Sequence, residues 1–330
     1  ARGDEELESM SANDEVNLKA KLLVVCLMRD EDLQMCRALN VDMVDLSVPV
    51  SDQHINHKLG RNRDWVLSGI KRQVPVAIDM GLDVCVGGED ASRADPEFLM
   101  RIIETAQQAG ASRFRFADTV GVMEPFGLIE IFKKMRAASD LELEMHAHDD
   151  LGLATANTLA AIRGGATHVN TTVHGLGERA GNAAMEEVVV GLKHLYGIDC
   201  GVDMENYAEL SLLVAEASGR PVSWQKSLVG DGVFTHEAGI HVDGLIKDPM
   251  NYQGIDPADL GRTHQLVLGK HSGSHAIVRA YHELGFNLHA DQVVCILQSI
   301  RNFVTLTKRT PEPIELIGFY NELIDDNRLL

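Results

Sequence analysis

The chain has 330 residues, of which 45% are hydrophobic and 24% charged, and its formal net charge is −19. This composition predicts a soluble globular protein with one large and one smaller domain. The negative charge argues against a nucleic-acid partner, because phosphate contacts require a basic face. No apolar run is long enough for a membrane span. The five cysteines form no C-x-x-C pair, which favours a reducing, cytoplasmic environment over a disulfide framework.

Six apolar, β-branched segments are predicted to be strands, and amphipathic helical segments alternate with them. The predicted strands are Leu22–Met28, Met43–Val50, Leu82–Glu89, Arg113–Gly121, Leu141–Asp149 and His168–Leu176. The predicted helices between them include Asp95–Gln108, Pro125–Ala138 and Gly152–Arg163. This alternation is typical of parallel βαβ units in an α/β fold.

Six parallel units fit either an open doubly wound sheet or part of an eight-unit barrel. Polar residues cluster after nearly every predicted strand, as at Glu89, Asp118 and His146, and barrel active sites are assembled at such strand ends. No G-x-G-x-x-G follows an early strand, as a dinucleotide-binding sheet would require. We therefore predict a TIM (β/α)8-type barrel that lacks its first two strands in this chain.

The alternation of strands and helices ends at about Ile198. The predicted helices beyond it are Tyr207–Ser218, His275–Leu284 and Ala290–Thr307, and a glycine-rich stretch occupies Val229–Gly244. The expected domains are a catalytic barrel over 1–200, a linker subdomain over 201–265 and an α-helical subdomain over 266–330.

The strongest chemical signal is the segment from Glu144 to Asp150. Residues two apart on a strand share a face, so Glu144, His146 and His148 point the same way. Two imidazoles at a barrel mouth are natural metal ligands, although ordinary hydrogen bonds at a strand end explain an isolated H-x-H pair equally well. The flanking acids favour a metal site, which then needs a further ligand from elsewhere.

Asn182 is the candidate for that further ligand. It closes a glycine-rich segment whose glycines allow the backbone to approach a ligand closely, and Arg179 in the same segment would flank the barrel mouth. A plain glycine-rich turn would have the same composition. Thr119 could hold a carboxylate with its hydroxyl, and Glu89 follows a glycine pair that leaves room for substrate. Acidic residues at strand ends are also common helix caps.

His236 and His241 lie five residues apart with Gly239 between them, so the helical H-E-x-x-H arrangement of metalloproteases is excluded. We expect His241 on an ordered loop, acting in proton transfer together with Tyr252. The alternative is a structural histidine.

Three segments resemble signatures of the homocitrate synthase and 2-isopropylmalate synthase family, within the DRE-TIM metallolyase superfamily. They are HAHDDLGLATAN at 146–157, GLGERAGN at 175–182 and FTHEAGIH at 234–241. The resemblance covers essentially the whole chain. It implies a TIM barrel followed by linker and helical subdomains, usually in a homodimer. The match looks closest to the nitrogenase-type homocitrate synthase, an enzyme of nitrogen fixation.

Members of this family condense acetyl-CoA with a 2-oxo acid, 2-oxoglutarate in the homocitrate synthases, on a divalent metal; the sequence does not distinguish Zn, Mn, Mg or Co. The implied metal ligands are His146, His148 and Asn182, and Glu144 and Thr119 are implied to surround the oxo acid. His241 and Tyr252 are implied to assist enolisation of the acetyl group, reaching the barrel of the neighbouring subunit.

The chain departs from the family pattern in two places. Lysine-pathway homocitrate synthases tend to carry an arginine near the glycine pair, where this chain has Cys85. We therefore expect His54, Arg61 or Arg63 to hold the distal carboxylate instead. An R-D-G-E-Q-type motif, which supplies a catalytic arginine and a metal-binding acid, has no counterpart here. We expect the chain as given to bind metal and turn over poorly.

Three alternatives to a homocitrate synthase stay open. A 2-isopropylmalate or citramalate synthase would differ in its 2-oxo acid. A barrel C–C lyase related to hydroxymethylglutaryl-CoA lyase would carry a cysteine in its glycine loop, whereas this loop reads Gly-Glu-Arg-Ala-Gly. A catalytically impaired, metal-binding protein would bind metal without turnover.

Overall fold

The computed structural model describes residues 20–38 and 41–325, and the chain divides into two compact units between Cys200 and Gly201. The first unit contains a six-stranded parallel sheet in the order β1-β2-β3-β4-β5-β6. Its strands are β1 (Leu23–Leu27), β2 (Met43–Pro49), β3 (Asp83–Glu89), β4 (Arg113–Asp118), β5 (Glu142–Ala147) and β6 (His168–Asn170). Its helices are α2 (Asp30–Ala38), α3 (Arg63–Asp79), α4 (Pro96–Ala109), α5 (Pro125–Ala138), α6 (Ala154–Gly164) and α7 (Met185–Tyr196).

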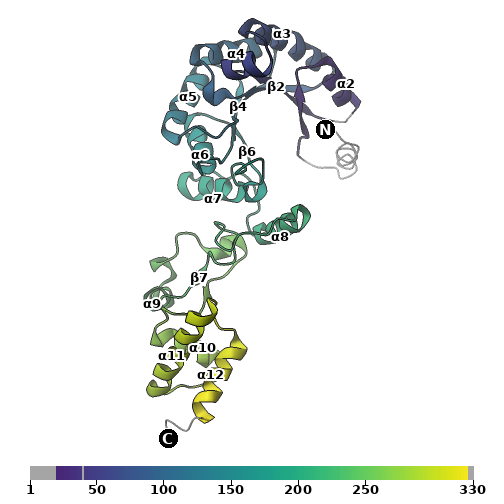
Figure 1. The fold of residues 1–330 in the computed structure, drawn as a ribbon. Coiled ribbons are helices and arrows are strands. Elements are labelled where there is room, and N and C mark those ends of the chain that lie inside the picture. Colours follow the sequence, from purple (N-terminus) through teal and green to yellow (C-terminus); the bar gives the residue numbers. More distant parts are fainter. Residues whose placement is uncertain (1–19, 39–40, 326–330) are drawn as a thin grey trace. The chain divides into compact units, whose positions relative to one another are not determined.

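The sheet is curled, and the helices lie along its outer side in an arc (Figure 1). Each strand pairs in parallel with the preceding strand of the chain, and a helical crossover connects the two. All carboxyl ends of the strands therefore lie at one rim. The predicted α/β class and barrel-type curvature are therefore confirmed by the described residues.

Local sequence explains where the helices begin and end. In α4, the side chain of Asp95 accepts a hydrogen bond from the backbone N–H of Phe98, and Pro96 occupies the first turn. The helix ends at Gly110, whose positive φ of 98° a glycine adopts without steric cost. Helix α5 begins in the same way, with Pro125 in its first turn and the Glu124 side chain capping its amino end.

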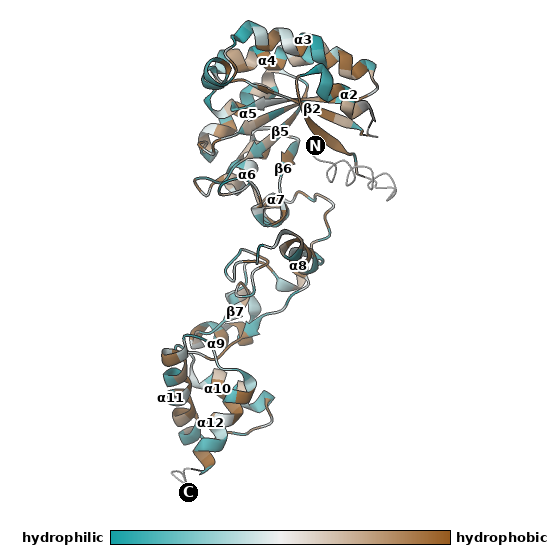
Figure 2. Cartoon of the chain, turned by 45° about the vertical axis from the view of Figure 1, so that its right-hand side comes forward, coloured by the Kyte–Doolittle hydropathy of each residue, from teal (hydrophilic) through white to brown (hydrophobic). Residues whose placement is uncertain are grey.

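The two faces of the sheet differ in chemistry. Residues turned toward the helices are apolar and fully buried, including Leu46, Val86, Phe116 and Met145. The opposite, inner face carries charged side chains, among them Asp45. β1, whose sequence is LVVCL, is one of the most hydrophobic parts of this unit (Figure 2).

The observed strands are shorter than the predicted ones, and two of them end three residues or more before the predicted end. The segment expected to reach Leu176 is a strand only over His168–Asn170, and a 3-10 turn, η3 (Val173–Gly175), follows. The reason is local: His174 has a φ of 60°, which no strand accommodates. The strand expected to reach Gly121 ends at Asp118, because the Asp118 carboxylate accepts hydrogen bonds from the backbone N–H groups of Val122 and Met123 and so closes a turn.

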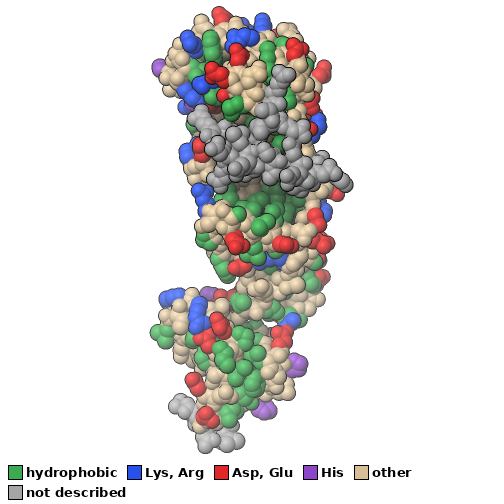
Figure 3. Space-filling view, turned by 90° about the vertical axis from the view of Figure 1, so that its right-hand side faces the viewer, with side chains coloured by type: hydrophobic (Ala, Val, Ile, Leu, Met, Phe, Trp, Pro, Cys, Tyr) green, Lys and Arg blue, Asp and Glu red, His purple; other side chains and the backbone are tan. Residues whose placement is uncertain are grey.

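The second unit is mainly helical. Its elements are α8 (Tyr207–Ser218), β7 (Thr235–His236), α9 (Gly239–Lys247), η4 (Pro249–Asn251), η5 (Pro257–Leu260), β8 (Gln265–Leu266), α10 (Ser274–Glu283), α11 (Ala290–Thr307) and α12 (Pro313–Asp325). α10, α11 and α12 enclose a core around Tyr281, whose hydroxyl donates to the carbonyl of Leu316 at 2.7 Å. Exposed apolar side chains such as Leu306 remain at the surface, and hydrophobic side chains are visible over this unit in Figure 3.

The sequence-based expectation for His241 is wrong in one respect. His241 lies inside helix α9, not on a loop, because Gly239 begins the helix instead of breaking it. A Cβ at Gly239 would lie 2.8 Å from the backbone nitrogen of Gly273, so close chain packing requires glycine there. His236 precedes this helix on β7, so the two histidines do not share a helix face. Helix α12 was not predicted.

Among the described residues, none of the helices combines the length and apolarity needed to cross a bilayer. The division of the chain into a barrel, a linker subdomain and a helical subdomain stays a prediction, as does the cytoplasmic location.

Candidate functional site

His146 and His148 lie at the carboxyl end of β5, on the inner face of the sheet. Their ring centroids are 4.9 Å apart and the rings are nearly perpendicular, at 82°. Nδ1 of His146 lies 3.0 Å from Oδ1 of Asn170 on the adjacent strand β6. Asn170 therefore orients the imidazole and leaves Nε2 of His146 available, as is common for histidines that bind a metal.

Asn182 is brought beside His148 by the loop that follows η3. The two residues form an antiparallel bridge, and the backbone N–H of Asn182 donates to Gly175 at 2.8 Å. The Asn182 amide donates from Nδ2 to the carbonyl of Leu176 at 2.9 Å, which turns Oδ1 away from that contact. The structure thus brings together the three residues that the sequence proposed as metal ligands, although Asn182 lies 36 positions after His146 and 34 after His148.

The glycines of this loop fix the position of Asn182. A Cβ on Gly177 would collide with the amide nitrogen of Asn182, and a Cβ on Gly181 would collide with the carbonyl of Gly175. Gly181 also has a φ of 100°, which side chains other than hydrogen rarely allow. The loop can therefore fold back on itself, with Asn182 against Gly175 and Gly177, only because these positions lack side chains.

Both imidazoles are held in the neutral form. Burial, with a smaller contribution from the nearby Arg115, lowers the pKa of His146 to about 4. Burial also lowers the pKa of His148, and the charge of Arg179 contributes in the same direction. A neutral imidazole has a lone pair to offer to a metal, so at neutral pH neither ring has to lose a proton first.

The orphaned polar atoms of this cluster fit a metal ion. Nδ1 of His148 and Oδ1 of Asn182 are buried and have no hydrogen-bond partner, and such atoms cost free energy unless something binds them. Across residues 20–38 and 41–325, no group of three or more His, Cys, Asp or Glu side chains is arranged to hold a metal. The set of two imidazoles and an amide oxygen therefore leaves coordination positions for other oxygen atoms, as in catalytic metal sites.

Arg179 and Thr119 lie on the rim next to this cluster. Arg179 forms a two-point ion pair with Asp150, with Nε 2.7 Å from Oδ1 and Nη2 2.8 Å from Oδ2. Nη2 of Arg179 also donates to the backbone carbonyl of Thr119 at 2.8 Å. The Thr119 hydroxyl accepts from the backbone N–H of Asp90 at 2.8 Å. These contacts join the ends of β3, β4 and β5 into one polar rim.

His54 and Glu89 form a second polar group on the rim, at the ends of β2 and β3. His54 lies on η1 (His54–Lys58), with Nδ1 3.6 Å from the Glu89 carboxylate. Lys58 holds the same carboxylate at 2.5 Å. The neighbouring Asp90 is fully buried and is bound by the Ser51 hydroxyl and by the guanidinium of Arg93 at 2.8 Å. This group is charged and internally paired.

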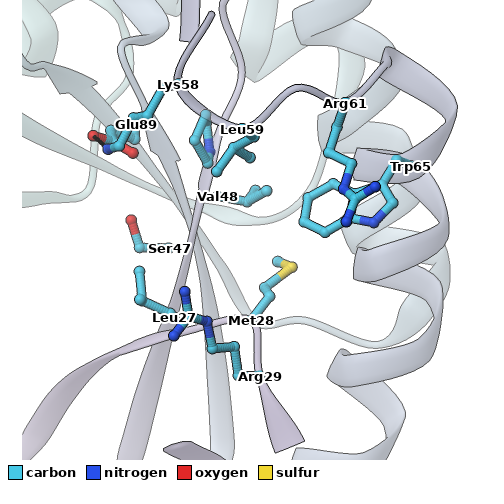
Figure 4. Close-up of a pocket in the computed structure, with 11 residues that line it drawn as sticks. Leu27, Met28, Arg29, Ser47, Val48, Lys58, Leu59, Arg61, Trp65 and Glu89 are labelled. Atoms are coloured by element: carbon cyan, nitrogen blue, oxygen red, sulfur yellow. Dashed lines mark hydrogen bonds and ion pairs between the residues drawn. The ribbon is translucent and has the colours of Figure 1, made fainter. Parts of the chain in front are cut away.

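A pocket of about 400 Å³ opens beside this second group (Figure 4). Its walls come from the ends of β1 and β2 and from the start of α3, and Trp65 and Arg61 lie next to each other on one side of it. The guanidinium of Arg61 lies 5.7 Å from the centre of the Trp65 ring. Its other lining residues combine two further cations, one carboxylate, one hydroxyl and apolar groups, namely Arg29, Lys58, Glu89, Ser47, Leu27, Met28, Val48, Pro49 and Leu59.

Glu144 lies on the inner face of β5, one inward position below His146. Its carboxylate accepts from Nη1 of Arg113 at 2.9 Å, and its exposed fraction is 6%. The sequence placed Glu144 beside the histidines, and the strand geometry does so, but its Oε2 is bound by Arg113. Whether Glu144 acts in catalysis stays a prediction.

The sequence did not single out the ion pairs under the rim. Asp45 on β2 is fully buried and pairs with Arg115 on β4. Burial raises the pKa of Asp45 to about 6, against the opposing effect of Arg115. Cys85, the residue found where an arginine was expected, lies beside Asp45 in the strand register and is buried. The alternation of charged and apolar residues in the segment Arg113–Asp118 was the signal that could have revealed this layer.

In the second unit, His241 and Tyr252 lie side by side. Their ring centroids are 4.3 Å apart, and both side chains reach the surface. A Cβ on Gly244 would collide with the Tyr252 ring, so α9 leaves a gap in which the tyrosine lies. His236 instead lies 3.0 Å from His264, which in turn contacts Gln253, in a separate chain of polar contacts.

Comparison with known proteins identifies the family. The family model described as HMGL-like matches residues 1–214, and the one described as homocitrate synthase post-HMGL domain-like matches residues 228–308. The chain belongs to the HMGL-like family. This assignment confirms the resemblance drawn from the three sequence segments.

Individual relatives within the HMGL-like family carry three different activities in their names. The chain is 43% identical to 2-isopropylmalate synthase 2 of Caldanaerobacter subterraneus subsp. tengcongensis, over 98% of this chain and 84% of the relative. It is 42% identical to homocitrate synthase 1 of Nostoc sp., over 98% of this chain and 85% of the relative. A (R)-citramalate synthase of Methanocaldococcus jannaschii is 42% identical over 84% of this chain and 56% of its own length.

Solved structures agree on the fold. The HMG-CoA lyase of Bacillus subtilis superposes with a TM-score of 0.54 at 21% identity, over 60% of this chain and 71% of the lyase. At this identity the likeness concerns the barrel fold alone. The family membership therefore comes from the sequence matches, and the curled sheet from the structure.

Proposed function

We propose that this chain is a condensing synthase that joins the acetyl group of acetyl-CoA to 2-oxoglutarate, giving homocitrate and free CoA. The observation that carries the proposal is the His146–His148–Asn182 cluster at the rim, which combines neutral rings with buried polar atoms that have no hydrogen-bond partner. Membership of the HMGL-like family, with homocitrate, isopropylmalate and citramalate synthases as relatives, supports the reaction class.

His146, His148 and Asn182 would hold a divalent metal, which when bound supplies a Lewis acid that polarises the oxo group of the substrate. Asn170 keeps the His146 ring in place through its contact at 3.0 Å. Arg179, tied to Asp150 and Thr119, keeps the rim closed beside the cluster. Thr119 and Glu89 are the proposed neighbours of the 2-oxo acid, and Glu144 supports the wall below His146 through its ion pair with Arg113.

The pocket lined by Trp65, Arg61 and Lys58 is the proposed location of part of the acetyl-CoA. An indole face suits the adenine ring, and the cations suit its phosphates. The pocket shares Glu89 with the rim group of His54.

His241 and Tyr252 are the proposed pair for proton transfer at the acetyl methyl group. The two rings lie within 4.3 Å of each other, so one side chain can orient the other. Removing the proton gives the enolate that attacks the oxo carbon, and hydrolysis of the thioester then releases CoA. The expected assembly is a homodimer in which this pair serves the barrel of the neighbouring subunit.

The decisive experiment measures release of free CoA by the purified chain with acetyl-CoA and each of three 2-oxo acids. Homocitrate synthesis requires turnover with 2-oxoglutarate that exceeds turnover with 2-oxoisovalerate and pyruvate. A preference for 2-oxoisovalerate or pyruvate would instead establish the isopropylmalate or citramalate reaction, which the 43% identical relative makes the second candidate. Because slow turnover is expected of this chain, each rate is compared with an enzyme-free background, and CoA release equal to that background with all three acids would contradict the proposal.

A further inference from the structure

Two arginines on β4 point into the concave side of the sheet. Arg113 and Arg115 alternate with Phe114 and Phe116, which are fully buried against the outer helices. Because alternate residues of a strand face opposite sides, both guanidinium groups lie on the same side as His146. In the register, Ala117 pairs with His146, so Arg115 lies one inward position below the rim.

The two guanidinium groups differ in how many of their N–H groups form hydrogen bonds. All three nitrogen atoms of Arg113 donate: Nε and Nη2 donate to Glu142 at 3.0 and 2.9 Å, and Nη1 donates to Glu144 at 2.9 Å. Arg115 pairs through Nη2 with Asp45, while its Nε is buried and has no hydrogen-bond partner. A guanidinium has five N–H donors in a planar fork that suits a carboxylate. Arg115 therefore has unused capacity for an anion.

The residues next to Arg115 on β3, and toward the rim on β4, are small, and the Asp45 carboxylate occupies the space beside Gly87. Gly87 pairs with Arg115 in the register, and a Cβ there would collide with the Asp45 carboxylate. Ala117 separates Arg115 from the rim on β4. No large side chain of β3 or β4 therefore stands between Arg115 and the position next to His146.

The separation suits a dicarboxylate. Two residues along a strand span about 6.6 Å, so Arg115 lies roughly that far below the level of His146. A 2-oxo acid held at the rim by its oxo and carboxylate oxygens would project the rest of its chain inward. With two methylene groups after the oxo carbon, the second carboxylate would come to the level of Arg115.

We propose that Arg115 binds the distal carboxylate of a 2-oxo dicarboxylate and thereby determines the substrate class of the site. This inference rests on the proposed function and deepens it, because it names the residue that distinguishes a dicarboxylate from 2-oxoisovalerate or pyruvate. It replaces the cations suggested by sequence alone. Of those, Arg63 pairs with Asp52 at 2.6 Å and also contacts Asp95, and so is already neutralised at the surface.

Asp45 is the counter-ion that holds Arg115 in place when no substrate is bound. Burial raises the pKa of this carboxyl to about 6, with Glu144 acting in the same direction and Arg115 against it. An incoming carboxylate can replace Asp45 at the guanidinium, and Asp45 then takes up a proton at little cost. The competing explanation is that Arg115 only neutralises Asp45.

The test uses the full chain with Arg115→Met combined with Asp45→Asn, which removes the buried pair without leaving either charge alone. Isothermal titration calorimetry in the presence of Mn²⁺ measures binding of 2-oxoglutarate and of pyruvate. We expect affinity for 2-oxoglutarate to fall about 10- to 100-fold, the effect of losing hydrogen bonds to a charged group, with little change for pyruvate. Arg113→Met is the matched control, and it is expected to affect both acids alike.

Two results would overturn the inference. One is unchanged affinity for 2-oxoglutarate in the folded double variant, and the other is equal binding of both acids by the wild-type chain. If the double variant does not fold, Asp45→Asn alone decides: freeing Arg115 should keep or tighten 2-oxoglutarate binding, and weaker binding contradicts the inference. Failure of the proposed function has a different signature, since 2-oxoglutarate would then bind through Arg115 without release of CoA.

Discussion

The inner and outer faces of the curled sheet are formed by the same strands but have different roles. On β4 and β5 the outward residues are aromatic or aliphatic, as at Phe114, Phe116 and Met145, and none of them is exposed. The inward residues of the same strands include Arg113, Arg115, Glu144 and His146. One residue of shift along these strands would exchange the two sets entirely.

Within one strand, the outward residues therefore stabilise the fold and the inward residues form the site. Apolar packing on the outer face fixes the register of the strands and contributes most to the folded state. With the register fixed, ion pairs and imidazoles are held on the inner face, although burying them stabilises the fold little or not at all. Substitutions on the two faces should therefore have distinct effects.

The largest effect is expected at the rim of the inner face. Replacing His148 by alanine removes one of two imidazoles, and we expect metal affinity to fall on the order of 1,000-fold, since loss of a supporting residue alone costs about 10- to 100-fold. Calorimetric titration with Zn²⁺ measures this. His168→Ala, on the same face of the adjacent strand, is the control and should bind Zn²⁺ like the wild-type chain; equal losses in both variants would contradict the assignment.

On the outer face, Phe116→Ala should reduce stability without altering the site. Phe116 is fully buried and packs against Phe132 of α5 at a ring-centroid distance of 5.6 Å. We expect the free energy of unfolding to fall by about 3–5 kcal/mol, the usual effect of truncating a buried phenylalanine. Urea unfolding measures the change. Phe126→Ala is the control, because that ring is 82% exposed, and its effect should stay within about 0.5 kcal/mol.

A smaller effect should follow from Gly177→Ala in the loop beside the rim. The new methyl group would displace the Asn182 amide, which is the end of a side chain and can move. We expect metal affinity to fall about 10-fold, as for changes that disturb the orientation of a ligand, while the melting temperature changes little. Gly318→Ala on α12, where no atom lies within 4 Å of the new methyl group, controls for glycine replacement. A large loss of stability in Gly177→Ala with normal metal binding would contradict this role of the loop.

The last effect concerns the dependence of stability on pH. The pKa of Asp45 is about 6 in the folded chain against an ordinary value of 3.8, so the folded state holds the proton more tightly. Its contribution to stability is therefore greatest below pH 4, declines as the pH rises to about 6, and is constant above that. The groups that influence this carboxyl are Arg115, Glu144 and Cys85.

In the Asp45→Asn variant, this decline of stability with rising pH should be absent. Urea unfolding between pH 4 and pH 7 should show a difference between wild type and variant that changes by on the order of 1–3 kcal/mol over this interval. A difference that stays constant with pH would show that Asp45 does not titrate in this range.

Much of the fold could be predicted because its signals are local. The strands of β2 and β3 follow from runs of β-branched residues, and α5, α8 and α11 were placed at their observed bounds from composition and spacing alone. The segment that includes His146 and His148 was recognisable because two positions on one strand face are enough to define the pair. Patterns within single elements were thus sufficient to predict most of the elements and the pair of histidines.

The remainder depends on contacts between distant segments. That Asn182 would lie beside His148 was only a hypothesis until the loop was seen to bridge back to β5. Which acid pairs with Arg113 and which with Arg115 is set by the register of neighbouring strands, and single residues do not encode it. The start of α9 at Gly239 was missed because the closely packed Gly273 lies 34 positions away.

The ion pair of Arg179 with Asp150 should make the site sensitive to ionic strength. It fastens the loop that carries Asn182 to the turn after β5, and Arg179 adopts a left-handed backbone conformation with a φ of 55°. With 42% of the arginine side chain exposed, dissolved ions screen this attraction. Rising ionic strength should therefore loosen the fastening, so that occupancy of the cluster by a weakly bound cation depends on the buffer.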